Sequence, residues 1–174
     1  MRVFHLISAV VAGALLVSAA NADEAVYTAP EGRDNAPYSE SVVYDDFIFL
    51  AGQLGVDRAT GEMPAGIGPQ TFQALTNMKG ALERAGGSMD AVLKCTVFLA
   101  DIEDWAAMNE VYVTFFPNKP ARTAVGGAGL GRDALVEIEC IAAAPDDDEE
   151  REEAEDESSD MDASMDETKE TDGE

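Results

Sequence analysis

The segment Pro120–Ala143, PARTAVGGAGLGRDALVEIECIAA, combines strand-like alternation with charged residues in apolar surroundings. Its two alternating halves are joined by a glycine-rich stretch, which predicts an antiparallel pair of strands that folds back near Leu130–Gly131. In that register Arg122 falls opposite Glu139 and diagonal to Glu137, within reach on one face. The pattern therefore predicts that one arginine and two glutamates lie together.

Period-two alternation also separates the two faces of the second strand. The face without charges is the predicted core side, and it carries Val136, Ile138 and Cys140. Arg122 and the glutamates form either a structural ion pair or a site for an anion, because a guanidinium is a rigid, two-pronged donor suited to a carboxylate. If one glutamate neutralises Arg122, proximity and burial raise the pKa of the other. That second glutamate can then position a water or accept a proton.

The chain before this segment predicts three more strands and two helices. Apolar residues spaced three and four apart mark both helices: Leu75, Met78, Leu82 and Ala85 in the first, and Trp105, Met108, Tyr112 and Phe115 in the second. Asp101 is the expected N-cap of the second helix. In order, the predicted elements are strands 41–44 and 47–51, helix 69–85, strand 91–100, a helix ending before Pro117, and the final strand pair. This β-β-α-β-α-β-β order predicts an α+β single domain.

Two helices can cover only one face of such a sheet. Strand 47–51, FIFLA, is apolar on both faces, so both of its faces need a cover. Self-association is the simplest way to cover the second face. It would place Arg122 and Glu137 at a subunit interface.

The N-terminus has the features of a secretory signal over residues 1–22. Arg2 precedes an apolar run, and Ala20-Asn21-Ala22 matches a small-x-small cleavage site. The run is short for a membrane span, although an uncleaved anchor is the alternative. We therefore expect a periplasmic or secreted protein, not bound to the membrane after cleavage, with an extended arm at 23–35 and a domain at 36–145.

Residues 146–174 contain 17 acidic residues and only two basic ones. They include no aromatic residue and no Val, Ile or Leu, so this tail cannot bury enough apolar surface to offset the entropy of ordering. We expect a disordered, solvating tail. A docking arm for a basic partner or a weak cation-binding segment is the alternative.

Composition also excludes several classes of function. Residues 23–145 hold 18 acidic and 8 basic residues, which disfavours nucleic-acid binding because a phosphate backbone needs a basic surface. The single histidine, His5, lies in the signal, which removes histidine-based triads and the usual zinc sites. Cys95 and Cys140 lie in apolar, strand-like runs. Export would permit a disulfide, but their core positions favour buried thiols over a bridge.

Several motifs together resemble the RidA (YjgF/YER057c/UK114) family of reactive-intermediate deaminases. In chain order they are Tyr38-Ser39, FLAGQLG at 49–55, TVFLAD at 96–101, MNEVY at 108–112 with Phe115-Phe116, PARTAV at 120–125 and LVEIE at 135–139. The resemblance covers residues 36–143. It implies a chorismate-mutase-like fold, a homotrimer and a ligand cleft between neighbouring subunits.

The resemblance also implies roles for individual residues. Arg122 matches the arginine that holds the ligand carboxylate, and Glu137 matches the glutamate that positions the hydrolytic water. Tyr38 and Asn109 match residues that line the cleft. Two further residues are expected to support the site: Gln53 and Glu139. No metal or organic cofactor is implied.

The resemblance implies hydrolysis of small 2-imino acids or their enamine tautomers, such as 2-aminoacrylate, 2-iminopropanoate or 2-iminobutanoate, to 2-keto acids and ammonia. The chain departs from the family pattern at four positions: Ala36 replaces a glycine, Ala51 a serine, Ala124 a cysteine and Gly131 a proline. These changes, Ala51 and Ala124 above all, support an alternative function. In that alternative the protein is a non-catalytic, carboxylate-binding or chaperone-like member that keeps the arginine clamp without turnover.

Overall fold

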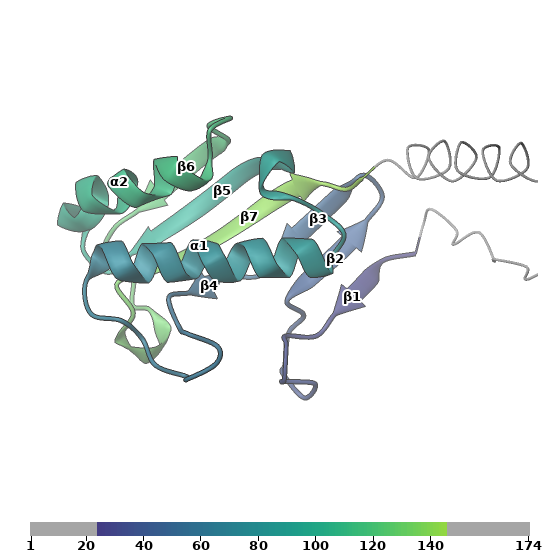
Figure 1. Ribbon diagram of the computed structural model, residues 1–174, viewed down its shortest axis with the longest axis horizontal. Coiled ribbons are helices and arrows are strands. Elements are labelled where there is room, and N and C mark those ends of the chain that lie inside the picture. The colour runs from purple at the N-terminus through teal and green to yellow at the C-terminus, as the bar shows by residue number, and fades with distance from the viewer. Residues whose placement is uncertain (1–23, 146–174) are drawn as a thin grey trace, which may run out of the picture.

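The computed structural model describes residues 24–145 (Figure 1). The expected signal and acidic tail lie outside these residues. Within them, no helix is both long enough and apolar enough to cross a membrane. The mixed α+β class predicted from the sequence is confirmed, because two α-helices lie against one sheet.

The sheet has the strand order β1-β2-β3-β7-β5-β6, with the short β4 also paired to β7. Most of these strands have the alternation of apolar and polar residues from which the sequence predicts a strand. Their bounds are β1 Val26–Thr28, β2 Ser41–Tyr44, β3 Phe47–Leu50, β4 Gln53–Leu54, β5 Val92–Leu99, β6 Ala121–Val125 and β7 Val136–Ala143. Strand β1 lies within the segment expected as an extended arm, and it pairs antiparallel with β2 at the sheet edge.

Both α-helices cover the same face of the sheet (Figure 1). Helix α1, Ile67–Arg84, buries its apolar stripe against the sheet, and α2, Trp105–Phe115, contacts α1. Three short 3-10 turns complete the structure: η1 Met89–Ala91, η2 Ile102–Asp104 and η3 Gly131–Asp133. Asp101 caps η2, just before α2, by accepting a hydrogen bond from the Glu103 amide. The core lies between the helices and the sheet and includes the predicted face of β7.

The predicted antiparallel pairing of the last two strands is wrong. Strand β5 lies between them, pairing parallel with β6 and antiparallel with β7. Both Arg122 and Cys140 are register partners of Cys95, so they share its face. Glu139, one residue along from Cys140, points to the opposite face. Arg122 and Glu139 are therefore separated by one strand and by the thickness of the sheet.

The expectation of two buried thiols is also wrong. Cys95 and Cys140 form a disulfide with their Cα atoms 4.1 Å apart. The β5–β7 register explains the bond, because it places the two residues directly opposite each other on one face of neighbouring strands. The sequence could not show this while the strand order was unknown.

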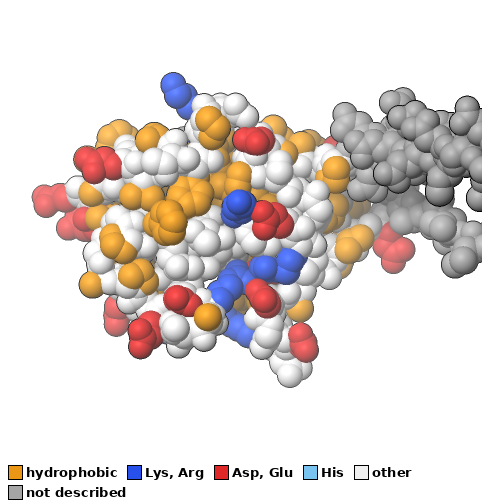
Figure 2. Space-filling view, viewed as in Figure 1, with side chains coloured by type: hydrophobic (Ala, Val, Ile, Leu, Met, Phe, Trp, Pro, Cys, Tyr) orange, Lys and Arg blue, Asp and Glu red, His pale blue; other side chains and the backbone are white. Residues whose placement is uncertain are grey.

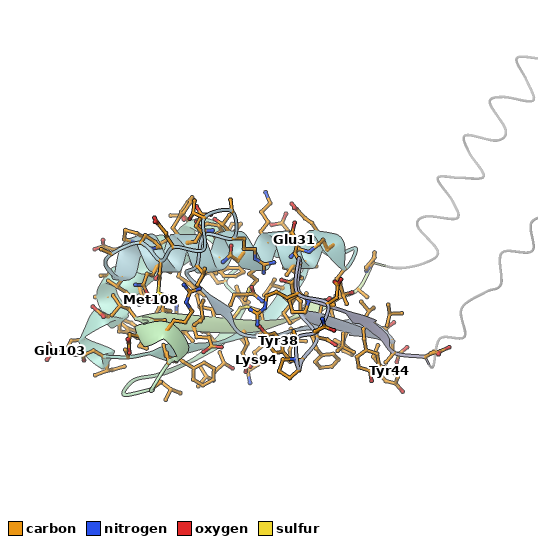
Figure 3. All side chains as sticks on the ribbon, turned by 90° about the horizontal axis from the view of Figure 1, so that it is seen from below. Glu31, Tyr38, Tyr44, Lys94, Glu103 and Met108 are labelled. Atoms are coloured by element: carbon orange, nitrogen blue, oxygen red, sulfur yellow. A yellow bond between two sulfur atoms is a disulfide. The ribbon has the colours of Figure 1, made fainter. Side chains whose placement is uncertain are left out.

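The second face of the sheet is open. Phe47 and Phe49 of β3 are 42% and 43% exposed there, beside exposed Tyr44 of the neighbouring strand. Figure 3 shows Tyr44 and Lys94 on the side of the sheet away from α1. The apolar, uncovered face expected from strand 47–51 is thus present in the single chain.

Candidate functional site

Glu137 lies in a cavity of about 720 Å³ beside β4 and β7. Glu137 is the register partner of Leu54 in β4. Strand β4 begins directly after Ala51-Gly52, so this pairing places Glu137 beside these two residues. The Glu137 carboxylate packs over Gly52 so closely that a Cβ atom at position 52 would overlap it. Glycine at this position therefore makes room for the carboxylate.

Burial raises the pKa of Glu137 above its ordinary value of 4.5, and the neighbouring negative charge of Glu139 raises it further. A carboxylate with a raised pKa is a better proton acceptor than an ordinary glutamate. Burial and a neighbouring glutamate are the two causes that the sequence predicts for a raised pKa, and both act on Glu137. Arg122 lies on the other face and contributes no compensating charge.

Arg122 lies on the helix side of the sheet edge, held by aromatic rings of α2. Its guanidinium carbon is 4.5 Å from the ring centroid of Tyr112 and 5.8 Å from that of Trp105. Such contacts orient the flat guanidinium group and leave its N–H donors free for a ligand. No ion pair involves Arg122 among the described residues.

The same helix contributes polar atoms that lack partners. Asn109 Oδ1 and the Tyr112 hydroxyl are buried without a hydrogen bond among residues 24–145. Burial raises the pKa of Tyr112 to about 12, although Arg122 opposes this rise, so its phenol is neutral at physiological pH. Buried polar groups are normally satisfied, so unpaired ones beside a free guanidinium indicate a place for a polar ligand.

The structure brings the predicted site residues together in two groups. Tyr38, Gln53 and Glu137 line the same cavity, with Ala51 beside them. Arg122 and Asn109 belong to the helix side, near the free edge of β6. Within one chain Arg122 lies on the helix-covered face and Glu137 on the open face, so these two residues do not form a single site.

The supporting residues have clear surroundings. Gln53 is buried, donates to the Ala51 carbonyl over 3.0 Å, and accepts from Arg58 over 2.8 Å. Tyr38 is half exposed, with the Arg33 guanidinium 5.6 Å from its ring centroid. Glu139 is exposed on the open face, so its predicted role in holding Arg122 is wrong within one chain.

Sequence reasoning missed an ionic cluster beside the cavity. Glu40 is buried and pairs with Arg58 and Arg84, which come from a loop and from the end of α1. These residues are 18 and 44 positions from Glu40, so no local spacing marks them. The aromatic partners of Arg122, Trp105 and Tyr112, belong to the apolar stripe that predicts the second helix, and the spacing alone does not distinguish rings that contact Arg122 from rings in the core.

Among the described residues, no group of His, Cys, Asp and Glu side chains is arranged to hold a metal ion. What the chain offers instead is a guanidinium that can bind a carboxylate, and a carboxylate that can activate water. Each of these two groups is a candidate part of a site for a small carboxylic acid.

Residues 28–144 match the family model described as Endoribonuclease L-PSP. The chain therefore belongs to this family, which is the RidA/YjgF family that its motifs resemble. The match covers almost all of the described residues.

Individual relatives agree with this membership. A RutC family protein from Pyrococcus horikoshii is 46% identical over 121 residues, covering 68% of this chain and 96% of that protein. A 2-iminobutanoate/2-iminopropanoate deaminase from Capra hircus is 45% identical over 108 residues, covering 61% and 79%. A crystal structure of E. coli TdcF with bound serine has 38% identity and a TM-score of 0.61, covering 63% and 90%. The deaminase relatives support a deaminase-like enzyme.

Proposed function

We propose that the protein hydrolyses small 2-imino acids, or their enamine tautomers, to 2-keto acids and ammonia. We further propose that the site forms between subunits of a homotrimer. The observation that carries this proposal is the division of the site. A free guanidinium and a carboxylate with a raised pKa lie on opposite faces of one sheet, so a second copy of the chain is needed to bring them together.

The chemistry needs only these two groups and a water molecule. Arg122 binds the substrate carboxylate through paired N–H donors and so fixes the imine carbon. Glu137 orients a water and accepts its proton as the water oxygen bonds to the carbon of the protonated C=N group. Glu137 gives the proton it accepted to the nitrogen, the C–N bond breaks as ammonia leaves, and the new hydroxyl group returns its proton to Glu137 as the C=O group of the keto acid forms.

The open sheet face supports the proposed trimer. Exposed Tyr44, Phe47 and Phe49 would be covered by neighbouring subunits, which relieves the cost of leaving aromatic surface in water. The relatives support the chemistry: one is named as a deaminase of two small imino acids, and TdcF binds serine, a small amino acid. In this chain the corresponding ligands would be small 2-imino and 2-keto acids.

A non-catalytic carboxylate-binding protein remains the second candidate. Ala51 lines the cavity beside Glu137, so a methyl group takes the place of the hydroxyl found in the family pattern. Fewer polar groups near the water would lower the rate without weakening the arginine clamp. In this candidate the protein binds 2-keto acids and releases no ammonia.

Ribonuclease activity, which the family description names, has less support in this chain. The excess of 18 acidic over 8 basic residues between 23 and 145 repels a phosphate backbone. The described part of the chain also lacks a histidine for general acid-base cleavage.

We propose export to an oxidising compartment, as expected from the signal-like residues 1–22. The Cys95–Cys140 disulfide supports this location, because such bonds persist in periplasmic and extracellular proteins. N-terminal sequencing of protein from the native host should find a chain that begins near Asp23. A chain retained in the cytoplasm with its N-terminus intact would contradict the proposal.

The deaminase proposal is tested by generating 2-iminobutanoate or 2-aminoacrylate in situ and following imine decay and ammonia release. We expect the wild type to exceed the buffer rate, and both Arg122→Ala and Glu137→Gln to lose at least tenfold. A wild-type rate equal to buffer would contradict the enzyme. Binding of 2-oxobutanoate without ammonia release would favour the non-catalytic candidate.

A further inference from the structure

A second basic group lies in the wall of the Glu137 cavity, and no step of the proposed reaction uses it. Its centre is Glu40, a carboxylate that is only 2% exposed. Arg58 donates to one Glu40 oxygen, and Arg84 donates to the other through Nε at 3.2 Å and Nη2 at 2.6 Å. Two guanidinium groups share one buried carboxylate, so the second positive charge depends on the exposed Glu31 for its counter-charge.

Arg58 is fixed by partners on one side only. Its Nη2 atom bonds both Glu40 and the buried side chain of Gln53. Its Nη1 atom has only a long contact, 3.8 Å, to Glu31 Oε2, and the same oxygen lies 3.3 Å from Arg84 Nη1. Neither contact to Glu31 has hydrogen-bond geometry. Arg58 therefore presents unsatisfied donors while its position is held rigidly.

Glu31 is a weak and exchangeable counter-charge. Its side chain is 63% exposed and belongs to the loop between β1 and β2 (Figure 3). An exposed ion pair of this kind contributes little to stability. A ligand carboxylate that bonds Arg58 directly would make a stronger, charge-assisted contact and could replace it.

Arg58, Glu31 and Glu137 all line the same 720 Å³ cavity. Figure 2 shows basic and acidic side chains gathered over the middle of the face that carries α1. A cavity of this size accepts ligands much larger than an imino acid of three or four carbons. Space therefore remains between the reacting carbon near Glu137 and the guanidinium of Arg58.

We propose that Arg58 is a specificity-determining residue that binds a second, terminal carboxylate of the substrate. The substrate class would then be dicarboxylic 2-imino acids, and Glu31 would move aside when they bind. This inference rests on the proposed deaminase site, because it assigns the far end of the same ligand. Glu40 acts as a positioning residue that holds Arg58 ready, which lowers the entropic cost of binding.

The test compares two product-like ligands, 2-oxoglutarate and 2-oxopentanoate, which differ by a terminal carboxylate in place of a methyl group. Their binding to the full chain is measured by calorimetry in phosphate-free buffer. We expect the wild type to bind 2-oxoglutarate about tenfold more tightly. Arg58→Gln should remove this preference while leaving 2-oxopentanoate affinity unchanged.

A second variant keeps the test decisive if Arg58→Gln fails to fold. Glu31→Gln removes the competing carboxylate from an exposed loop and should strengthen 2-oxoglutarate binding several-fold, with no effect on 2-oxopentanoate. Glu103→Gln is the matched control, because this exposed glutamate lies well apart from Glu31 (Figure 3). It should change neither affinity.

Equal affinities for the two ligands, or a 2-oxoglutarate preference unchanged in both variants, would overturn the proposal. Competition with inorganic phosphate is a further check. If phosphate binds as tightly as 2-oxoglutarate and blocks its binding, the cavity is a general anion site and the proposal is overturned. Imine decay is measured separately on each protein. Selective 2-oxoglutarate binding without turnover would contradict the deaminase and support the Arg58 site.

Discussion

At the scale of single residues, the reactivity of Glu137 depends on its surroundings. The carboxylate is partly buried over Gly52, and Glu139 lies two residues away on the same face of β7. Both effects raise its pKa, with burial the larger. Because folding raises this pKa, the ionised carboxylate destabilises the folded state, and that effect disappears as the pH falls through the folded-state pKa.

The pH dependence of the reaction follows from this environment. Glu137 acts as a carboxylate, so kcat/KM should fall with decreasing pH through its raised pKa. Glu139→Gln removes one cause of the rise and should shift this acidic limb to lower pH. Burial of Glu137 remains in this variant, so the acidic limb of the kcat/KM profile should still lie at a higher pH than the pKa of an ordinary glutamate. An acidic limb that does not move in Glu139→Gln, or that moves equally in Glu103→Gln, would contradict the assignment.

The aromatic contacts of Arg122 lead to a second prediction. Tyr112→Phe keeps the ring and removes only the hydroxyl, which has no partner in the described chain and is available to a ligand, so 2-oxobutanoate binding should weaken less than when the ring is lost. Tyr112→Leu removes the ring face and should weaken binding several-fold. Calorimetry measures both, with thermal unfolding to confirm that each variant is folded. Full affinity in Tyr112→Leu would show that the ring does not orient Arg122.

At the scale of elements, the sequence predicts which residues form strands and helices better than it predicts strand neighbours. The alternation of apolar and charged residues predicts the core face of β7 correctly, since Val136, Ile138 and Cys140 are all buried. It could not reveal that β5 separates β6 from β7. The chain crosses from β5 through α2 to reach a parallel β6, a connection that parallel neighbours require. The glycine-rich segment after β6 is equally compatible with a hairpin and with a longer connection.

The disulfide between β5 and β7 should contribute measurably to stability. It closes a loop between residues 45 positions apart, and bonds of this kind typically stabilise by about 2–4 kcal/mol. Cys95→Ala combined with Cys140→Ala should lower the urea midpoint accordingly. Thiol labelling of the unfolded wild type without reductant should find no free cysteine. Two labelled thiols, or an unchanged urea midpoint in the double variant, would contradict this role.

The turn before β4 controls the position of Glu137. In Gly52→Ala the new methyl group would occupy the space of the carboxylate, which is the flexible end of its side chain and so would move. We expect deaminase activity to fall on the order of tenfold or more, with the free energy of unfolding changed by less than about 1 kcal/mol. Gly129→Ala is the control, because no atom lies within 4 Å of its Cβ position. Equal activity in the two variants would contradict the prediction.

At the scale of the whole molecule, the sequence predicts candidate site residues but not how they are arranged. Tyr38, Gln53 and Glu137 do share one cavity. Arg122 was expected beside the glutamates, yet its neighbours are the rings of α2. The ionic cluster around Glu40 was not predicted, because its members become neighbours only when α1 packs beside the β1–β2 loop. A single chain therefore contains two partial sites, and the open apolar face indicates how copies could join them.

The measurement that tests this account most directly is activity in mixed oligomers. Arg122→Ala and Glu137→Gln chains, each inactive alone, are co-expressed with different tags, and oligomers that contain both are purified. If each site takes Arg122 from one subunit and Glu137 from the next, every trimer that contains both chains has one intact site, so about a third of the sites are restored. We predict imine hydrolysis at about that fraction of the wild-type rate. Mixed oligomers as inactive as their parents would contradict a site shared between subunits.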